Sequence, residues 1–293
     1  MRNRAALLLA NAGFEVLITC LLARELMLKG RLFLMRLISV VVIIATLTLA
    51  GCKDTDTPNN GNGNGNANRV SDFKPPPPLK PTQAVDPAFK PCNAYFPLVP
   101  GSVAKYVLNY SSGMTADVTV IVDAADEGGR KVFTQQSQII DRSGGLQFVQ
   151  SIVRKFVCNG DKVEILSETT DSTMSGRKSG SEFEYRENSL IMPGPDELLR
   201  KGSTWSHTLR TITRNPGEPP QRSDVPIVIK LESAGVEDVT TAAGNFKAVK
   251  VIRTIGENGT IDFYAAGIGL VRRFAKEGTS WELKEYSGLT AQN

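Results

Sequence analysis

The C-terminal two thirds of the chain alternate apolar and polar residues with a period of two, which is typical of strands with one buried face. Val118, Val120 and Val122, for example, alternate with Thr119 and Ile121. Similar runs cover residues 103–110, 130–140, 146–157, 162–168, 182–186, 204–213, 227–232, 246–255, 260–265, 268–275 and 280–286. The pattern predicts an all-β domain over residues 91–287, built on an antiparallel sheet and long enough for one sizeable core.

Short glycine-containing turns separate these runs and favour hairpins, because glycine and asparagine tolerate a positive φ. They are Glu127-Gly128-Gly129, Ser143-Gly144-Gly145, Asn159-Gly160-Asp161 and Glu257-Asn258-Gly259. One short helical turn is expected near residues 195–201, started by Pro195 and stopped by Gly202. The predicted architecture is therefore a half-open barrel or a sandwich with this helical turn.

Two distant segments share a Leu-x-x-Gly-Ser core, one at Leu98 to Ser102 and the other at Leu199 to Ser203. Two interpretations are open. Either the domain has two similar halves that each begin with a turn into a strand, or two unrelated strands use the same type of turn.

The N-terminal region has the pattern of a secretory signal peptide, which needs a positive charge, a short apolar core and small residues at the cut. Arg36 supplies the charge, residues 37–49 the apolar core, and Ala50 and Gly51 the small residues. This core is shorter than the ~20 residues of a spanning helix. Leu49-Ala50-Gly51-Cys52 resembles the lipobox of bacterial lipoproteins.

The lipobox resemblance implies cleavage between Gly51 and Cys52 and attachment of two or three acyl chains, palmitate among them, to Cys52. Two or more chains anchor a protein stably to a membrane. The expected location is the bacterial cell envelope. Lys53 stands where an Asp favours inner-membrane retention, so the resemblance implies the outer membrane if the host is Gram-negative. The alternative is an uncleaved anchor helix that ends at Cys52.

Residues 1–51 are expected to be leader and signal peptide, with translation starting at Met35 or Met27; a long natural n-region is the alternative. Residues 52–90 read as a disordered tether, because an Asn/Gly run and then a proline run cannot build a core. The proline run could instead be a ligand for an SH3-like groove. Residues 288–293 are expected to be a tail.

Net charge argues against a nucleic-acid partner. The chain has 34 Lys+Arg and 30 Asp+Glu, and loss of residues 1–51 leaves 28 of each. The mature chain is therefore neutral and has no basic excess to neutralise phosphates.

Cys92 and Cys158 are the cysteines that remain after the leader and the lipidated residue are set aside. An even pair in an exported domain predicts a disulfide. Two free buried thiols are the alternative.

Neither a catalytic group nor a cofactor or metal site is predicted. His207 is the single histidine, which leaves no multi-histidine metal site, and no Gly-x-Ser-x-Gly motif accompanies it. It is expected at the surface or half-buried. Asp123, Asp126 and Glu127 lack the alternating spacing of a calcium loop and are interpreted as a solvated hairpin.

Three further motifs resemble those of a widespread group of uncharacterised exported β-rich bacterial proteins. They are Tyr95-Phe96-Pro97-Leu98-x-x-Gly101, Ala243-Gly244-x-Phe246-x-Ala248-x-x-Val251 and Tyr264-x-Ala266-Gly267-x-Gly269-Leu270-Val271. Ala104 stands where the group usually has a tryptophan. The resemblance implies an exported β-rich fold, in some relatives a half-open barrel like that of periplasmic lipid carriers, and no particular activity.

The sequence therefore favours a membrane-anchored, non-enzymatic envelope lipoprotein whose β domain binds an envelope protein or an apolar ligand. One alternative is a hydrolase of envelope polymers whose carboxylates the sequence does not locate, since such pairs are defined by distance in space. The other is a structural surface lipoprotein.

Overall fold

The computed structural model describes residues 76–141, 148–174, 176–185 and 189–292. They belong to one compact unit, Pro75–Asn293. The leader, the lipobox with Gly51 and Cys52, residues 52–75 of the expected tether and the Ser143-Gly144-Gly145 turn lie outside the described residues. No helical segment in the described ranges has the length and hydropathy of a membrane span.

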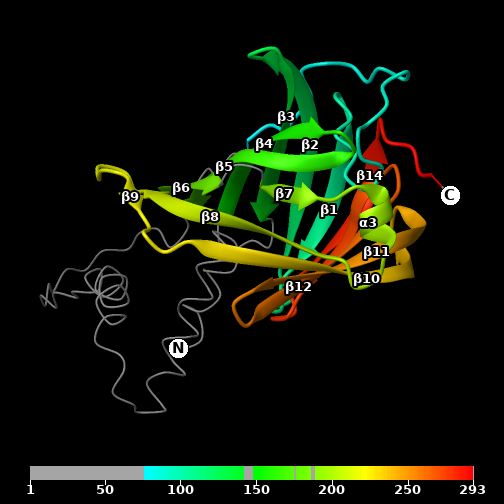
Figure 1. The fold of residues 1–293 in the computed structure, drawn as a ribbon. Helices are drawn as coiled ribbons and strands as arrows, with labels where there is room; N and C mark the ends of the chain where they lie inside the picture. Colours follow the sequence, from blue (N-terminus) through cyan, green and yellow to red (C-terminus); the bar gives the residue numbers. More distant parts are fainter. Residues whose placement is uncertain (1–75, 142–147, 175, 186–188, 293) are drawn as a thin grey trace, which may run out of the picture. The chain divides into compact units, whose positions relative to one another are not determined.

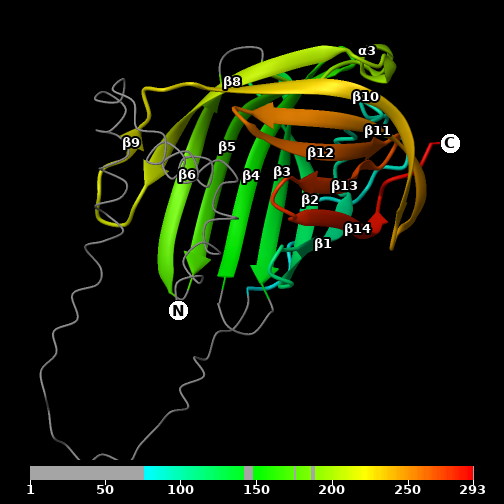
Figure 2. The same ribbon diagram turned by 90° about the horizontal axis from the view of Figure 1, so that it is seen from below.

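Twelve antiparallel strands of the described region form a closed barrel (Figures 1 and 2). The strands are β1 (Val103–Asn109), β2 (Thr115–Glu127), β3 (Arg130–Asp141), β4 (Phe148–Asn159), β5 (Lys162–Met174), β6 (Arg177–Tyr185), β8 (Thr204–Arg214), β10 (Ile227–Thr241), β11 (Gly244–Ile255), β12 (Asn258–Ala265), β13 (Gly269–Ala275) and β14 (Ser280–Ser287). Each strand of this ring pairs with the next one along the chain, and β14 pairs with β1 to close it.

The all-β, antiparallel prediction is confirmed. Of the half-open barrel and the sandwich that the sequence left open, the fold is a barrel, and it is closed where a half-open one was expected. Because β8 pairs with both β6 and β10, the sheet closes into a barrel and does not split into a sandwich. Figure 2 shows β2 to β6 as one wall and β10 to β14 as the wall that faces it. Three shorter elements complete the described fold: β7 (Leu190–Met192), α3 (Pro195–Leu199) and β9 (Gln221–Arg222).

The period-two pattern assigns one face of every strand to the interior of the barrel, which we call the lumen. On β4, Phe148, Gln150 and Ile152 are buried, and the register places Ile139 of β3 beside Gln150. Residues of the alternate set, such as Lys230 on β10, are exposed. Burial of each large apolar side chain contributes about 1.5 to 3 kcal/mol.

The expected helical turn and two of the hairpins form where the sequence places them. Pro195 stands at the start of α3, with acidic residues in the first turn. Gly128 and Gly129, with φ of 60° and 80°, make the two-residue turn between β2 and β3. The turn before β12 lies earlier than expected, at Gly256 and Glu257, because Gly256 supplies the positive φ of 56°.

The two Leu-x-x-Gly-Ser segments occupy equivalent places in the ring. Each precedes the first of six consecutive strands, β1 to β6 in one half and β8 with β10 to β14 in the other. The Gly101 amide donates to the Val122 carbonyl at 2.8 Å, and the Gly202 amide donates to the Ser233 carbonyl at 2.7 Å. The matching strand order and hydrogen bonds favour the interpretation of two similar halves.

The segment before β1 plugs one end of the barrel. Asn93 is fully buried, and its amide donates to the carbonyls of Asp161 at 2.7 Å and Pro193 at 2.8 Å. The Phe96 ring packs edge-on against Phe156, with centroids 5.2 Å apart. Contacts to two turns and an inner-face aromatic ring therefore seal this plugged end.

A disulfide fastens the plug to the barrel wall. Cys92 and Cys158 are joined with an S–S distance of 2.02 Å and a Cα–Cα distance of 6.2 Å, the pairing expected from the sequence. It links the chain just before Asn93 to the end of β4.

The folded unit extends beyond the predicted limits of 91–287 at both ends. Thr82, placed in the tether by the sequence, donates its backbone N–H to Asp123 Oδ1 at 2.8 Å, and Phe89 packs against Phe133. Gln292, placed in the tail, donates to the Ala266 carbonyl at 3.0 Å. Asp123 is consequently buried, contrary to the prediction, because the N-terminal segment covers it. Asp126 and Glu127 are exposed, as expected for a solvated hairpin.

Candidate functional site

The motifs shared with exported β-rich proteins pack against one another. The Gly267 amide donates to the Ala94 carbonyl at 2.7 Å. A Cβ at Gly269 would lie 3.2 Å from Pro97 Cδ, so glycine lets the two motifs approach closely. Ala94, Pro97, Gly267 and Gly269 therefore hold the plug in place.

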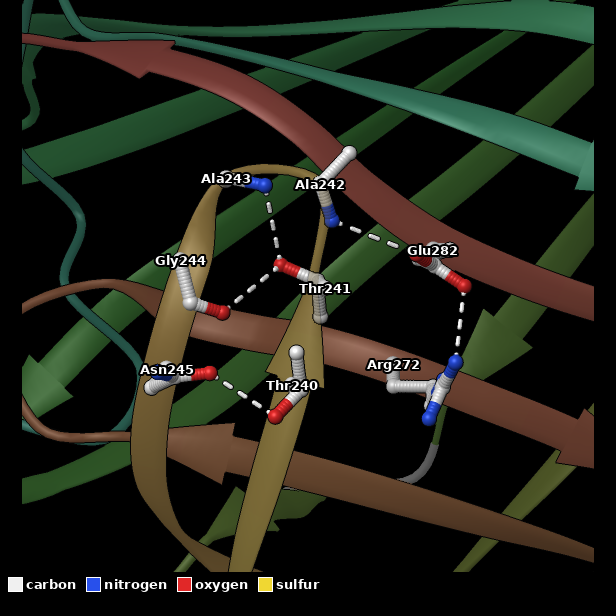
Figure 3. A network of polar contacts seen from close by, with 8 residues as sticks. All are labelled: Thr240, Thr241, Ala242, Ala243, Gly244, Asn245, Arg272 and Glu282. Atoms are coloured by element: carbon white, nitrogen blue, oxygen red, sulfur yellow. Dashed lines mark hydrogen bonds and ion pairs between the residues drawn. The ribbon is translucent and has the colours of Figure 1, made fainter.

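The remaining motif forms the β10–β11 hairpin tip, which is fastened to β14 (Figure 3). Glu282 accepts the Ala242 N–H at 3.2 Å through one oxygen and binds Arg272 at 2.8 Å through the other. Thr241 Oγ1 accepts the Ala243 N–H at 3.1 Å within the turn. These contacts hold the hairpin tip against β14.

A layer of polar side chains crosses the lumen next to the plug, and it is the strongest candidate site among the described residues. The register assigns its strand residues to the inner face. We call it the polar layer; its members are Tyr106, Arg154, Glu168, Tyr185, His207, Arg253, Asp262, Tyr264 and Arg273.

One wall of the layer is built on an ion pair between neighbouring strands. Arg154 on β4 binds Glu168 on β5 with Nε–Oε2 of 2.7 Å and Nη2–Oε1 of 3.3 Å. Tyr185 donates its hydroxyl to Glu168 Oε2 at 3.1 Å. Burial alone would raise the pKa of Glu168, but the Arg154 guanidinium outweighs burial and lowers the pKa. Glu168 therefore stays ionised at neutral pH.

The opposite wall carries a second, bidentate pair. Arg273 on β13 binds Asp262 on β12 through Nε at 2.6 Å and Nη2 at 2.7 Å. Tyr264 donates its hydroxyl to Asp262 Oδ2 at 3.2 Å. The Arg273 guanidinium lies 5.8 Å from the Trp281 ring. Burial would lower the pKa of Arg273, but Asp262 outweighs burial and raises the pKa.

The two arginines belong to opposite walls yet act on each other. Burial lowers the pKa of Arg154 and Glu168 raises it, with a net increase, while the charge of Arg273 acts against that increase. Their side chains remain 30% and 25% exposed. Since both lie on the inner face, this exposed surface faces the lumen.

His207 is the clearest correction to the sequence interpretation. It is 6% exposed, not at the surface, and its ring lies 5.9 Å from Tyr185. Burial lowers the pKa of His207 to about 4, with a further contribution from Arg253, so the imidazole is neutral at pH 7. Its ring hydrogen-bonds the Leu190 backbone, and Nδ1 has no partner among the described residues.

The sequence contains a pattern that could have predicted the burial of His207. It shares the inward parity of Trp205 and Leu209 on β8, both buried. Arg154 likewise follows the parity of Ile152. A polar residue that occupies a position of the buried, otherwise apolar set of a strand is expected to point into the lumen. Only the pairing of distant strands shows that several such residues lie close together.

A hollow of about 470 Å³ lies beside β5, β6 and β8, away from the polar layer. Its lining includes Asp171 and Arg214, which form an ion pair at 3.4 Å. In the described ranges, no group of three or more His, Cys, Asp or Glu side chains is arranged to hold a metal ion.

Together these contacts define a closed antiparallel barrel with a plug at one end and a charged layer across its lumen. Solved structures similar to this chain include two bacterial proteins. One, from Bacteroides fragilis NCTC 9343, is described as a candidate exported protein with a YmcC-like fold; the TM-score is 0.45 and the identity 16%, over 67% of this chain and 100% of that one.

The other is described as a candidate lipoprotein from Parabacteroides distasonis ATCC 8503. It has a TM-score of 0.42 and 13% identity, over 68% of this chain and 100% of its own. No family model matches the chain, and no curated protein matches it.

Proposed function

We propose that the chain is a lipid-anchored, non-enzymatic protein of the bacterial envelope whose barrel binds a small ligand in its lumen. The lipobox at Cys52 supports the anchor, and Lys53 supports the outer membrane in a Gram-negative host. The observation that carries ligand binding is the solvent-accessible surface of Arg154 and Arg273 inside the barrel. Guanidinium groups in such a place offer directed hydrogen-bond donors.

The charges of the polar layer argue against a hydrolase of envelope polymers. Such an enzyme needs one carboxyl group with a raised pKa to act as general acid. Glu168 has a lowered pKa, and Arg273 holds Asp262 in a bidentate pair. His207, neutral and bonded to the backbone, contacts the Tyr185 ring. These contacts support ligand binding as the proposed role.

The anchor is tested by labelling host cells with a palmitate analogue. We expect the label on the wild-type protein and its loss in Cys52→Ser. Cys20→Ser is the matched control, since Cys20 lies in the leader and its replacement leaves the label in place. Label that survives the Cys52 substitution would overturn the anchor.

Ligand binding is tested on the mature chain with Cys52→Ser, exported to the host envelope behind an ordinary, non-lipoprotein signal peptide, purified, and examined by native mass spectrometry. We expect a complex heavier than the polypeptide that loses its extra mass on solvent extraction. A mass equal to the polypeptide alone, both before and after extraction, contradicts a lumen ligand.

A further inference from the structure

We infer that the lumen ligand is an acidic amphiphile whose carboxylate or phosphate group lies between the guanidinium groups of Arg154 and Arg273. The inference rests on the proposed lumen-binding function and specifies the chemistry of its ligand.

The two arginines have hydrogen-bond donors that their carboxylate partners do not use. Each binds its carboxylate through Nε and Nη2. A guanidinium carries five N–H donors, so each arginine has donors beyond those two contacts. With 30% and 25% of the two side chains exposed, these donors reach the lumen. A ligand group with two or three acceptor oxygens can accept hydrogen bonds from the free N–H donors of both guanidinium groups.

The charges of the two guanidinium groups also favour an anion. Arg154 and Arg273 project from opposite walls, and the charge of Arg273 acts against the raised pKa of Arg154. An anion between them would be attracted by both guanidinium groups.

The lumen also contains buried polar atoms that have no hydrogen-bond partner among the described residues. His207 Nδ1 and Thr260 Oγ1 have none among the described residues, and the two side chains are 6% and 3% exposed. Thr260 lies two residues from Asp262 on the inner face of β12. Buried polar atoms are normally hydrogen-bonded, so these two indicate a hydroxyl or water that accompanies the ligand.

The apolar part of the ligand follows from the neighbouring inner-face residues. Ile152 lies two positions from Arg154 on β4, and Trp281 pairs with Arg273. Leu108 pairs with Trp281 in turn, and Trp281 is only partly buried. Apolar side chains of β1, β4 and β14 therefore lie beside the charged layer, although Gln150, two residues beyond Ile152, hydrogen-bonds Ser172 on the same face. The apolar positions fit a hydrocarbon body attached to the acidic group.

The test uses the mature chain with Cys52→Ser and isothermal titration of three probes: dodecanoate, dodecanol and inorganic phosphate. We expect dodecanoate to bind at least tenfold more tightly than either of the others. The double variant Arg154→Met/Glu168→Gln removes both members of an ion pair and so avoids an unpaired buried charge. It should weaken dodecanoate at least tenfold and leave dodecanol unchanged.

Arg210→Met is the matched control, because the inner-face parity of Leu209 places Arg210 on the outer face of β8. It should change neither affinity. Equal binding of dodecanoate and dodecanol would overturn the acidic headgroup and leave lumen binding intact. Phosphate that binds as tightly as dodecanoate would overturn the amphiphile. Failure of all three probes, with no ligand in native mass spectra, would overturn the proposed function as well.

Discussion

Gly101 and Gly202 have the same conformation in equivalent turns but different surroundings. Their φ values are 84° and 86°. A Cβ at Gly101 would lie 2.6 to 2.8 Å from backbone atoms of residues 83–85, whereas nothing lies within 4 Å of one at Gly202. The two positions therefore separate the effect of positive φ from the effect of close packing.

We expect Gly202→Ala to destabilise the domain by about 1 kcal/mol, the conformational term alone. Gly101→Ala must in addition displace residues 83–85, so it should lower the free energy of unfolding by more than about 3 kcal/mol. Urea unfolding of both variants measures the difference. Equal losses would mean that residues 83–85 do not press on Gly101.

His207 predicts a dependence of stability on pH. Its pKa is about 4 in the fold against 6.5 as a free side chain, so the unfolded chain binds an extra proton between these values. Stability therefore falls as pH decreases through this window, by up to ~1.4 kcal/mol per pH unit.

We expect His207→Gln to reduce the dependence of the unfolding free energy on pH between pH 6.5 and 5. This window lies above the range where carboxyl groups titrate. Thermal or urea unfolding across this range measures the slope. A slope that is unchanged in the variant would mean that His207 is not the titrating group.

The β10–β11 hairpin is held to β14 by the Glu282 carboxylate, which bonds both a backbone amide and an arginine, and by a hydrogen bond from the Ala243 amide to the Leu283 carbonyl at 3.3 Å. The Glu282 carboxylate, which binds Arg272, is 32% exposed. The Glu237 carboxylate, which binds Lys250 within the β10–β11 hairpin at 2.9 Å, is 47% exposed. The two ion pairs should therefore differ in strength.

Glu282→Ala should lower stability by about 1 to 2 kcal/mol, because it leaves the Ala242 amide and Arg272 without this acceptor. Glu237→Ala should change stability by less than about 0.5 kcal/mol. Hydrogen exchange should show faster exchange at Ala242 in the first variant only. Slow exchange in both would show that the turn itself, and not Glu282, fixes the tip.

The closed ring joins strands that are far apart in sequence, and the disulfide reinforces it at the plugged end. The Cys92–Cys158 bond closes a loop with a sequence separation of 66. Restricting a loop of this size in the unfolded chain contributes about 4 kcal/mol in the chain-entropy description.

The double variant Cys92→Ser/Cys158→Ser should therefore unfold at lower urea, with a loss of up to about 4 kcal/mol. Reduction of the wild-type disulfide should reproduce the loss, and reducing agent should leave the double variant unchanged. Identical midpoints for wild type and variant would show that contacts around Asn93 hold the plug without the bond.

Much of the fold could be predicted from local pattern. Alternation of residues such as Val118 and Val120 is a property of neighbouring positions, and the turn at Gly128 and Gly129 needs only two residues that accept positive φ. Strand type and most hairpins follow from such short-range signals. Burial of Asp123 does not, because it depends on a segment 41 residues away.

By itself, the sequence determined the strand-forming pattern, the disulfide partners and the lipobox resemblance, since each depends on residue type and spacing. The tertiary structure decided that the sheet closes, that the plug covers one end, and that Arg154, Glu168, Asp262 and Arg273 share one lumen. The reason is that ring closure requires long-range pairing of β1 with β14 and of β8 with β10. That pairing brings inner-face charges from distant strands together, and no local pattern encodes their meeting.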